Sequence, residues 1–481
     1  MGLRGGPRFR VREGAKRPDI VLFLTDEQRH DQVGYSSGGH FETPHLDALA
    51  ARGTIFERAY SGSTVCVPSR ASLLTGLSYP RLPLQHASLA LREGSWTLPR
   101  VLRSVGYRTA LVGKMHFSPM YADHGFDVMK LAEHLVPFSG YGHPEIDDYH
   151  KFLMWQGRAD ARATHMYGPG LDALGEEYNQ NHSAVPFPYD ASLHPVGWVA
   201  STAKDVIAKR DGDAPLFLVV SFPRPHTPLD PAEPYASMYD PKDARVPDES
   251  FEPNLSLPGA FRAAFESAKR DRHPLQRWDA ISDPVKRRIL TAVRGLTRQI
   301  DDAVGDVLSA LDPSRSVVFF TSDHGSYDGH RGLLGKVPWL PFEDLARVPF
   351  VCAAPGGATG QRVRAPVQSW DFALTCMDYA GVDPPPGVFD SESLRPILEG
   401  GAPDEGRPVF TGGIVCQPML VRGPHKLIRN GQGEEVLFDL ATDPGETRDV
   451  LEDAKYGSVV SELRAELSRV LARETVDLPV R

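Results

Sequence analysis

The chain has few cysteines, no long apolar run and no tract of basic residues. Its four cysteines among 481 residues are Cys66, Cys352, Cys376 and Cys416. None lies in a CxxC pair or at a zinc-ligand spacing from histidine, which excludes a disulfide framework and a structural zinc site. No run reaches the roughly 18 apolar residues that a membrane span needs. We expect a cytoplasmic protein with no targeting leader and no membrane partner.

Acidic residues outnumber basic ones by 62 to 53, which gives a formal net charge of −9. Because the basic residues form no arm, this balance argues against nucleic acid as a partner. An anionic substrate would need a local cationic pocket. The 44 glycines and 42 prolines stay below the roughly 25–30% of a chain that indicates disorder. We therefore expect a globular protein with many ordered loops.

Short apolar runs without polar alternation predict buried strands. They are DIVLFLT at 19–25, LFLVVSF at 216–222 and SVVFFT at 316–321, with similar segments at 109–112 and 348–354. Such runs are typical of parallel strands covered on both faces. Helical patterns lie between them, at 46–52, 98–104, 296–311 and 372–380. This alternation predicts an α/β fold with a large, mostly parallel central sheet flanked by helices.

From about residue 399 the pattern changes to short apolar runs separated by turns, followed by an amphipathic stretch at 459–471. This predicts a smaller C-terminal antiparallel sheet with one helix on it. We place one domain at 17–398 and a C-terminal subdomain at 399–481. Two segments, 120–199 and 231–285, lack sustained periodicity. They are predicted to be long irregular insertions, which usually have a function.

Acidic residues follow two of the predicted strands. Asp26 and Glu27 come after the first run, and Asp323 and His324 come after SVVFFTS. In open α/β sheets ligands bind beyond the carboxyl ends of the strands. Carboxylate oxygens with one imidazole suit a divalent cation such as Ca²⁺, Mg²⁺ or Mn²⁺. The two strand ends together predict a metal site.

The segment CVPSRASLLTG covers residues 66–76. Pro68 suits the first turn of a helix, so Cys66 falls at or just before a helix N-terminus. Free amides there favour an anion, and Arg70 would add a bidentate donor. By itself this pattern indicates an activated cysteine, with a buried core cysteine as the alternative.

The same segment resembles the signature of the type I sulfatases, in the alkaline-phosphatase-like superfamily, whose C-x-P-S-R cysteine is oxidised to Cα-formylglycine. The resemblance continues in family order from about residue 17 to about residue 475. Its further segments are DIVLFLTDE at 19–27, TPHLDALAARGTIFERAY at 43–60, GKMH at 113–116, SFPRPHTPLD at 221–230, SDHG at 322–325, GK at 335–336 and LFDLATDPGETRDV at 437–450.

This resemblance implies an arylsulfatase-like hydrolase that converts a small-molecule sulfate monoester into an alcohol or phenol plus sulfate. The implied metal ligands are Asp26, Glu27, Cys66, Asp323 and His324. Residue 66, as the hydrated aldehyde, would attack sulfur and form a covalent sulfate ester. Besides Cys66 as this nucleophile, the implied catalytic residues are Arg70, Lys114 and Lys336, which would hold the sulfate oxygens. His226, with Lys336, would donate a proton to the leaving alcohol, and His116 would be the base that expels sulfate.

The implied cofactor is one divalent metal. Oxygen ligands favour Ca²⁺, and the imidazole makes Mn²⁺ the alternative. A formylglycine-generating enzyme acting on CVPSR is the implied protein partner, and a homo-oligomer is compatible with the chain. Three positions depart from the family: Glu27 stands where many members have Asp, and His330 and Arg331 stand where Asp and His are usual. We expect Arg331 to form a salt bridge.

Two other functions compete with this one. A phosphonate monoester hydrolase or phosphodiesterase resembles sulfatases through the same formylglycine and metal site, but CVPSR lacks the insertion or Ala substitution of that branch. A non-catalytic binding protein with the same fold is the third. Aromatic and histidine side chains of the first insertion either line the leaving-group pocket or pack the insertion itself; they are Tyr149, Trp155, His165, Tyr167 and Tyr178.

Overall fold

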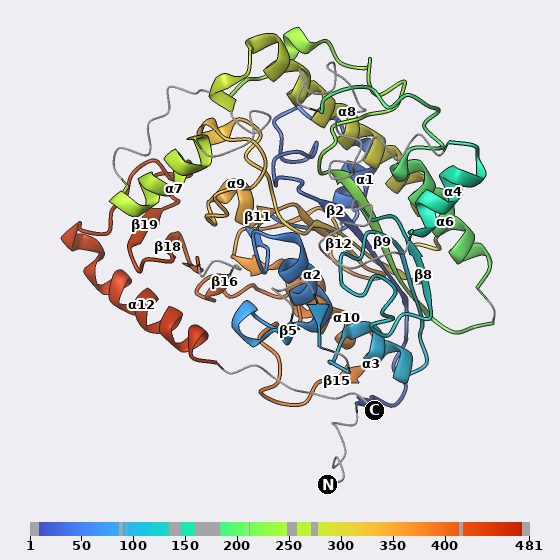
Figure 1. The fold of residues 1–481 in the computed structure, drawn as a ribbon. Coiled ribbons are helices and arrows are strands. Elements are labelled where there is room, and N and C mark those ends of the chain that lie inside the picture. The colour runs from blue at the N-terminus through green and yellow to red at the C-terminus, as the bar shows by residue number, and fades with distance from the viewer. Residues whose placement is uncertain are drawn as a thin grey trace.

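An eight-stranded sheet forms the centre of the computed structural model, with helices on both of its faces (Figure 1). The structure describes residues 9–85, 90–92, 94–133, 146–158, 183–210, 212–247, 257–270, 278–412 and 417–473. In spatial order the strands are β13 (Gln361–Val363), β3 (Thr54–Phe56), β12 (Phe350–Ala353), β10 (Ser316–Ser322), β2 (Asp19–Asp26), β9 (Leu216–Pro225), β7 (Arg108–Gly113) and β8 (Val128–Leu131). From β10 to β8 all neighbours are parallel, and β12 is antiparallel to both of its neighbours. The predicted α/β fold with a mostly parallel sheet is confirmed.

Strand β2 shows why its sequence has no polar alternation. Leu22 packs in one apolar cluster, on the face covered by α2 (Cys66–Thr75), α3 (Leu98–Ser104) and α10 (Phe372–Tyr379). Phe23 packs in a second cluster, on the face covered by α1 (Pro44–Ala51), α6 (Pro195–Ala208) and α8 (Asp283–Leu308). Successive side chains of a strand point to opposite faces. Because both faces are covered, every residue of the strand is buried.

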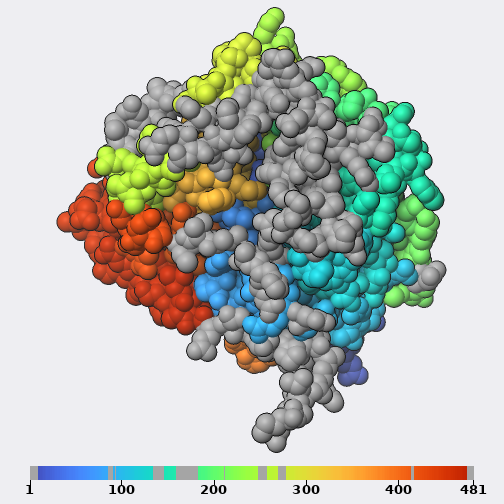
Figure 2. Space-filling view, in the orientation of Figure 1, coloured from blue at the N-terminus to red at the C-terminus, as the bar shows by residue number. Residues whose placement is uncertain are grey.

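The predicted C-terminal sheet is also present, as four antiparallel strands. They are β16 (Val409–Thr411), β17 (Met419–Arg422), β18 (His425–Arg429) and β19 (Glu435–Asp439). Leu427 and Leu437 on one face pack against α12 (Gly457–Leu471). Ile428 and Phe438 on the other face pack toward the main body and α7 (Gly259–Arg270), and Figure 2 shows this C-terminal part in red beside α7. The division of the chain at residues 398 and 399 stays a prediction.

The two segments expected to be irregular contain helices, and in this respect the prediction is wrong. The first holds α4 (Asp148–Trp155) and the second holds α7. In α7, Phe261, Phe265 and Ala268 are buried on one side, at the spacing of a helical face. The remaining short strands and α-helices are β1 (Arg10–Val11), β4 (Ala59–Tyr60), β5 (Leu84–Gln85), β6 (Ala90–Leu91), α9 (Glu343–Ala346), β11 (Arg347–Val348), β14 (Val367–Gln368), β15 (Val382–Asp383) and α11 (Arg395–Leu398). Across the described ranges, every helix is too short or too polar to cross a membrane.

A buried network of five charged side chains joins the C-terminal segment to the main body. Arg331 pairs with Asp344 at 2.7 Å and with Glu446 at 2.9 Å. Lys426 pairs with the same Glu446 at 2.7 Å and with Glu343 at 2.9 Å. The expected salt bridge of Arg331 is therefore present. Its partners come from segments more than a hundred residues apart in sequence, so the network links parts of the chain that local structure cannot hold together.

Substitution Glu446→Ala is expected to destabilise the protein by about 3 kcal/mol, because it removes the buried carboxylate that accepts from Arg331, Lys426 and the backbone amide of Glu343 and leaves these donors with fewer acceptors. Urea unfolding followed by circular dichroism measures the change. The control is Glu462→Ala, which removes an exposed pair with Arg422 and should cost less than about 1 kcal/mol. Equal unfolding midpoints for the two variants would contradict the prediction.

Candidate active site

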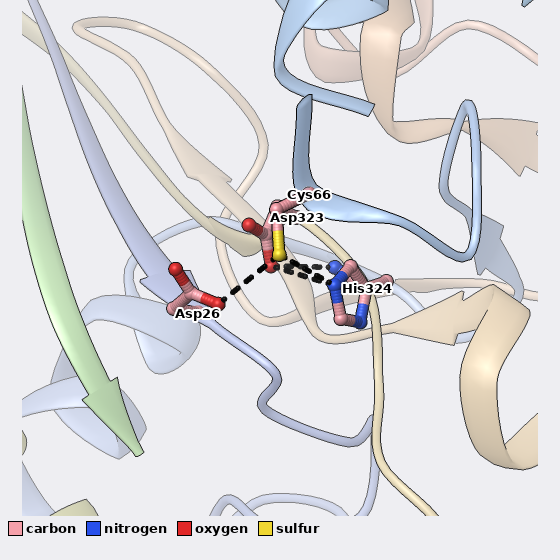
Figure 3. A group of neighbouring side chains, drawn as sticks. All are labelled: Asp26, Cys66, Asp323 and His324. Atoms are coloured by element: carbon pink, nitrogen blue, oxygen red, sulfur yellow. Dashed lines mark hydrogen bonds and ion pairs between the residues drawn. The ribbon is translucent and has the colours of Figure 1, made fainter. Parts of the chain in front are cut away.

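Four potential metal-ligating side chains converge beyond the carboxyl ends of β2 and β10. Asp26 ends β2, while Asp323 and His324 directly follow β10. The two strands pair in parallel with Thr25 opposite Ser322, so the next residues lie side by side. Cys66 opens α2, and its Sγ lies 3.1 Å from His324 Nε2 and 3.6 Å from Asp26 Oδ1. Figure 3 shows the four side chains pointing toward one another, and one ligand atom from each lies within 4.8 Å of the others.

Helix α2 places two of the predicted residues on one face. Cys66 and Arg70 are four positions apart, so they lie one above the other. All ten residues of this helix are buried, and its Leu73 packs in the same cluster as β2. Gly76 ends the helix with a φ of +66°, in the left-handed region that glycine adopts without steric cost. The helix therefore holds residue 66 rigidly against the two strand ends.

The guanidinium of Arg70 connects the two carboxylates. Its Nε donates to Asp323 Oδ2 at 2.8 Å, and its Nη2 donates to Asp26 Oδ2 at 3.1 Å. Its Nη1 donates to the carbonyl of Lys114 at 2.8 Å and to Ser221 Oγ at 2.9 Å. Burial alone would lower the pKa of Arg70, but the two carboxylates raise it. Arg70 thus holds the acidic side chains in place.

The loop after β7 carries Lys114 and His116. Lys114 Nζ forms an ion pair with Asp26 Oδ2. His116 has a φ of +68°, which is uncommon outside glycine. Glu133 fixes this conformation, because its Oε1 accepts hydrogen bonds from the backbone amides of Met115 at 2.7 Å and His116 at 2.8 Å. Burial, and secondly the charge of Lys114, hold the pKa of His116 well below its usual range.

Glu27 lies beside this group, between two basic side chains. Lys336 Nζ pairs with its carboxylate and also lies 3.3 Å from Cys66 Sγ. His226 Nε2 lies 3.4 Å from Glu27 Oε1. Burial would raise the pKa of Glu27, yet His226 and Lys336 lower it to about 2. Glu27 shares a potential ligand group with Asp26 and His226 and is absent from the group of Figure 3, so its role as a direct ligand stays a prediction.

The residues around Cys66 fit a divalent cation. Asp26 and Asp323 are fully buried and supply the hard oxygen ligands that such ions prefer. His324 Nδ1 donates to the carbonyl of Gly325 at 2.8 Å, which is the usual second contact of a metal-binding histidine and leaves Nε2 facing the group. Burial would lower the pKa of His324, but Asp323 and Cys66 raise it to about 9. Metal binding at Nε2 would therefore displace a proton.

The structure brings the predicted site residues together. Of the five insertion residues for which two roles were open, lining the leaving-group pocket or packing the insertion, it describes Tyr149 and Trp155. Trp155 is 93% exposed, and Tyr149 packs against Trp198 in the second cluster. The other three, His165, Tyr167 and Tyr178, lie outside the described residues. Sequence reasoning also missed supporting residues at the site. They are Glu133, Ser221, Arg224 and Asp230. Of these, only Arg224 and Asp230 could have been noticed in the sequence, because they are opposite charges on either side of His226.

Comparisons with known proteins show which family the chain resembles. A family model described as "Sulfatase" matches residues 18–382. The chain is 30% identical over 477 residues to an arylsulfatase of Clostridium perfringens, covering 95% of this chain and 94% of that protein. It is 26% identical to a choline-sulfatase of Rhizobium meliloti, covering 91% and 83% of the two chains.

Solved structures show the same fold. A phosphonate monoester hydrolase of Agrobacterium radiobacter superposes with a TM-score of 0.75 at 24% identity, over 95% of this chain and 96% of that chain. A protein solved in complex with its substrate D-glucosamine-2-N,6-O-disulfate superposes with a TM-score of 0.73 at 18% identity, over 94% and 97% of the two chains. The fold therefore extends over nearly the whole chain.

The metal-stripped protein is expected to bind one divalent cation at the group around Cys66, and Asp323→Asn should weaken this binding on the order of a hundredfold, since even an outer contact of a ligand contributes 10–100-fold. Titration calorimetry with Ca²⁺ and with Mn²⁺ measures the affinity. The control is Asp301→Asn, because Asp301 belongs to another potential ligand group, with His45 and Asp302. Equal losses in the two variants would refute this placement.

Proposed function

The chain belongs to the sulfatase family and is a sulfuric ester hydrolase, and we propose that its nucleophile is residue 66 after conversion of the cysteine to Cα-formylglycine. One observation carries the proposal: Cys66 Sγ lies among Asp26, His324 and Lys336 at the start of a buried helix. A hydroxyl of the hydrated aldehyde would occupy the place of this sulfur. The nucleophile would then lie among buried charged side chains, where a bound divalent cation would add the positive charge that an anionic ester requires.

The proposed metal ligands are Asp26, Asp323, His324 and residue 66, with Glu27 at the edge of the group. We propose Ca²⁺ as the ion, because most of these ligands are oxygens, with Mn²⁺ as the alternative. When bound, the cation would supply Lewis-acid stabilisation of the negative charge on the sulfuryl oxygens. Lys114 and Lys336 add fixed positive charge beside it, and fixed charges of this kind stabilise a transition state without reorganisation.

In the first step a hydroxyl of residue 66 passes its proton to Asp26, whose Oδ1 lies 3.6 Å from the position of Cys66 Sγ. Its oxygen attacks sulfur as the bond between sulfur and the leaving oxygen breaks. The electron pair of that bond stays on the leaving oxygen, which takes a proton from His226 Nε2. Burial lowers the pKa of His226 to about 4, although Glu27 partly opposes the effect. The negative charge of the bound ester would raise it again. Lys336, beside Glu27, can share this role.

In the second step His116 takes the proton of the other hydroxyl of residue 66. The carbonyl of the aldehyde re-forms as the bond between carbon and the sulfate oxygen breaks, and sulfate leaves with that electron pair. Neutral His116 suits a base, and its lowered pKa keeps it neutral. A thiol has no second hydroxyl, so an unmodified cysteine could not complete this step.

The partner proposed for the modification is a formylglycine-generating enzyme acting on residues 66–70. All residues of α2 are buried, which supports modification before the chain folds. For the physiological ester we propose an aryl sulfate as the first class to test, from the 30% identity to an arylsulfatase. Choline sulfate and sulfated sugars are the other classes.

Wild-type protein whose residue 66 is formylglycine by mass spectrometry should turn over 4-nitrophenyl sulfate many times. Cys66→Ser keeps one hydroxyl but cannot re-form an aldehyde, so we expect one equivalent of nitrophenol and a covalently sulfated protein. Cys66→Ala should give neither product while keeping the wild-type circular dichroism spectrum. Repeated turnover by the serine variant, or by protein with unmodified Cys66, would overturn the proposed mechanism.

Phosphonate monoester hydrolysis is the second candidate, because the same cationic groups would stabilise a phosphonate, and the superposition on such an enzyme is extensive. We expect kcat/KM for 4-nitrophenyl sulfate to exceed that for 4-nitrophenyl phenylphosphonate on the same preparation. Measuring both with the Cys66→Ala variant as a blank separates the activity from contamination. A larger value for the phosphonate would favour the second candidate.

A further inference from the structure

The loop that carries His226 is closed by a buried ion pair. Arg224, near the end of β9, donates from Nε to Asp230 Oδ1 at 2.7 Å and from Nη2 to Asp230 Oδ2 at 2.9 Å. The two residues are only 1% and 2% exposed. A bidentate contact fixes both the distance and the orientation of the two groups. The pair therefore holds together the two ends of the segment 225–229.

A histidine from another segment orients the carboxylate of this pair. His194 Nδ1 accepts the amide hydrogen of Val196 at 3.3 Å, so its Nε2 carries the hydrogen, and this atom lies 3.5 Å from Asp230 Oδ1. Phe187 packs edge-on against the His194 ring, with the ring centres 4.9 Å apart. Asp230 thus cannot rotate away from Arg224 without breaking contacts to a second element.

Inside the closed loop, His226 has a defined ring orientation. Its backbone amide donates to the carbonyl of Asp26 at 3.0 Å. Its Nδ1 lies 2.8 Å from the carbonyl of Thr227, and since a carbonyl only accepts, Nδ1 carries a hydrogen. Nε2 is then the atom that faces Glu27 and the site. A proton donor needs this placement to within about 0.5 Å.

We propose that Arg224 and Asp230 are positioning residues for His226: their ion pair sets the loop so that Nε2 delivers its proton to the leaving oxygen as the bond from sulfur breaks. This inference rests on the proposed function, which assigns His226 as the proton donor. Neither Arg224 nor Asp230 touches the reacting atoms in it. The pair acts only through the ring that it holds, so its loss should affect the steps that need the proton.

The dependence of rate on the leaving group tests this role. Nitrophenolate leaves readily without a proton, whereas phenols of higher pKa need one. We expect Arg224→Lys, which cannot form the bidentate contact, to change kcat for 4-nitrophenyl sulfate less than about threefold. For the poorest aryl leaving groups kcat should fall on the order of ten- to a hundredfold, within the range of a general acid's contribution. KM should change less than about twofold, because substrate binding does not use the proton.

Two reference variants are measured on the same series of aryl sulfates. His226→Ala should show the same steeper dependence of kcat on the pKa of the leaving group, and a larger loss of kcat. Arg407→Lys is the matched control, since Arg407 also makes a buried bidentate contact, with Asp371 at 2.6 and 2.7 Å, in another part of the molecule. It should lower stability without changing the dependence on the leaving group. If Arg224→Lys does not fold, Asp230→Asn, which keeps one acceptor for Arg224, takes its place in the comparison.

The outcomes distinguish failure of the positioning role from failure of the proposed function. A steeper dependence for Arg224→Lys and not for Arg407→Lys supports the inference. A uniform loss for Arg224→Lys across all leaving groups overturns it and leaves the proposed function standing. If the dependence of kcat on the leaving group is no steeper in His226→Ala than in wild type, His226 is not the proton donor, and the inference is wrong as well. If formylglycine-containing wild-type protein hydrolyses no sulfate ester, the proposed function itself fails.

Discussion

The site depends on one interaction, the contact of Arg70 with two buried carboxylates at the ends of adjacent strands. Parallel pairing of β2 and β10 brings Asp26 and Asp323 together, with carboxylate oxygens within 4.8 Å of each other. Two buried negative charges this close repel strongly. Arg70 bridges them at 3.1 and 2.8 Å. Because Arg70 and Cys66 share one face of α2, the helix whose arginine relieves this repulsion also positions residue 66, the proposed nucleophile. The C-x-x-x-R spacing therefore has a structural reason apart from catalysis.

The balance of charge at the site gives a reason for the metal. Once His324 has lost its proton to bind a metal, Asp26, Glu27 and Asp323 supply three negative charges. Among the described residues, Arg70, Lys114 and Lys336 offset them. In the ion pairs of the structure, Arg70 and Lys114 contact Asp26, and Lys336 contacts Glu27. Little of their charge is left for a substrate. An anionic ester thus requires a further positive charge, and a divalent cation at the carboxylates supplies it.

The sequence predicts the strands and motifs at the centre of the fold because local composition determines them. β2, β9 and β10 are covered on both faces, so each reads as an unbroken apolar run, and the residues that follow them reach the site. α7 was missed because charged residues and neighbouring prolines obscure its apolar face. Glu133 was missed for a different reason: it acts through backbone amides 17 and 18 residues away, and no local pattern marks a partner of that kind.

The basic residues of the site are supported by segments distant in sequence, which explains why the fold extends far beyond the motifs. Lys336 ends a loop that is closed by a hydrogen bond from the backbone amide of Tyr327 to the carbonyl of Gly335. Within that loop, Arg331 forms an ion pair with Glu446 of the C-terminal segment. His116 is held by Glu133, whose own amide donates to Asp147 at 2.6 Å. A buried charged side chain is precise only if its neighbours are fixed. The C-terminal segment and the first insertion therefore support the site, since each fixes a loop that carries one of its basic residues.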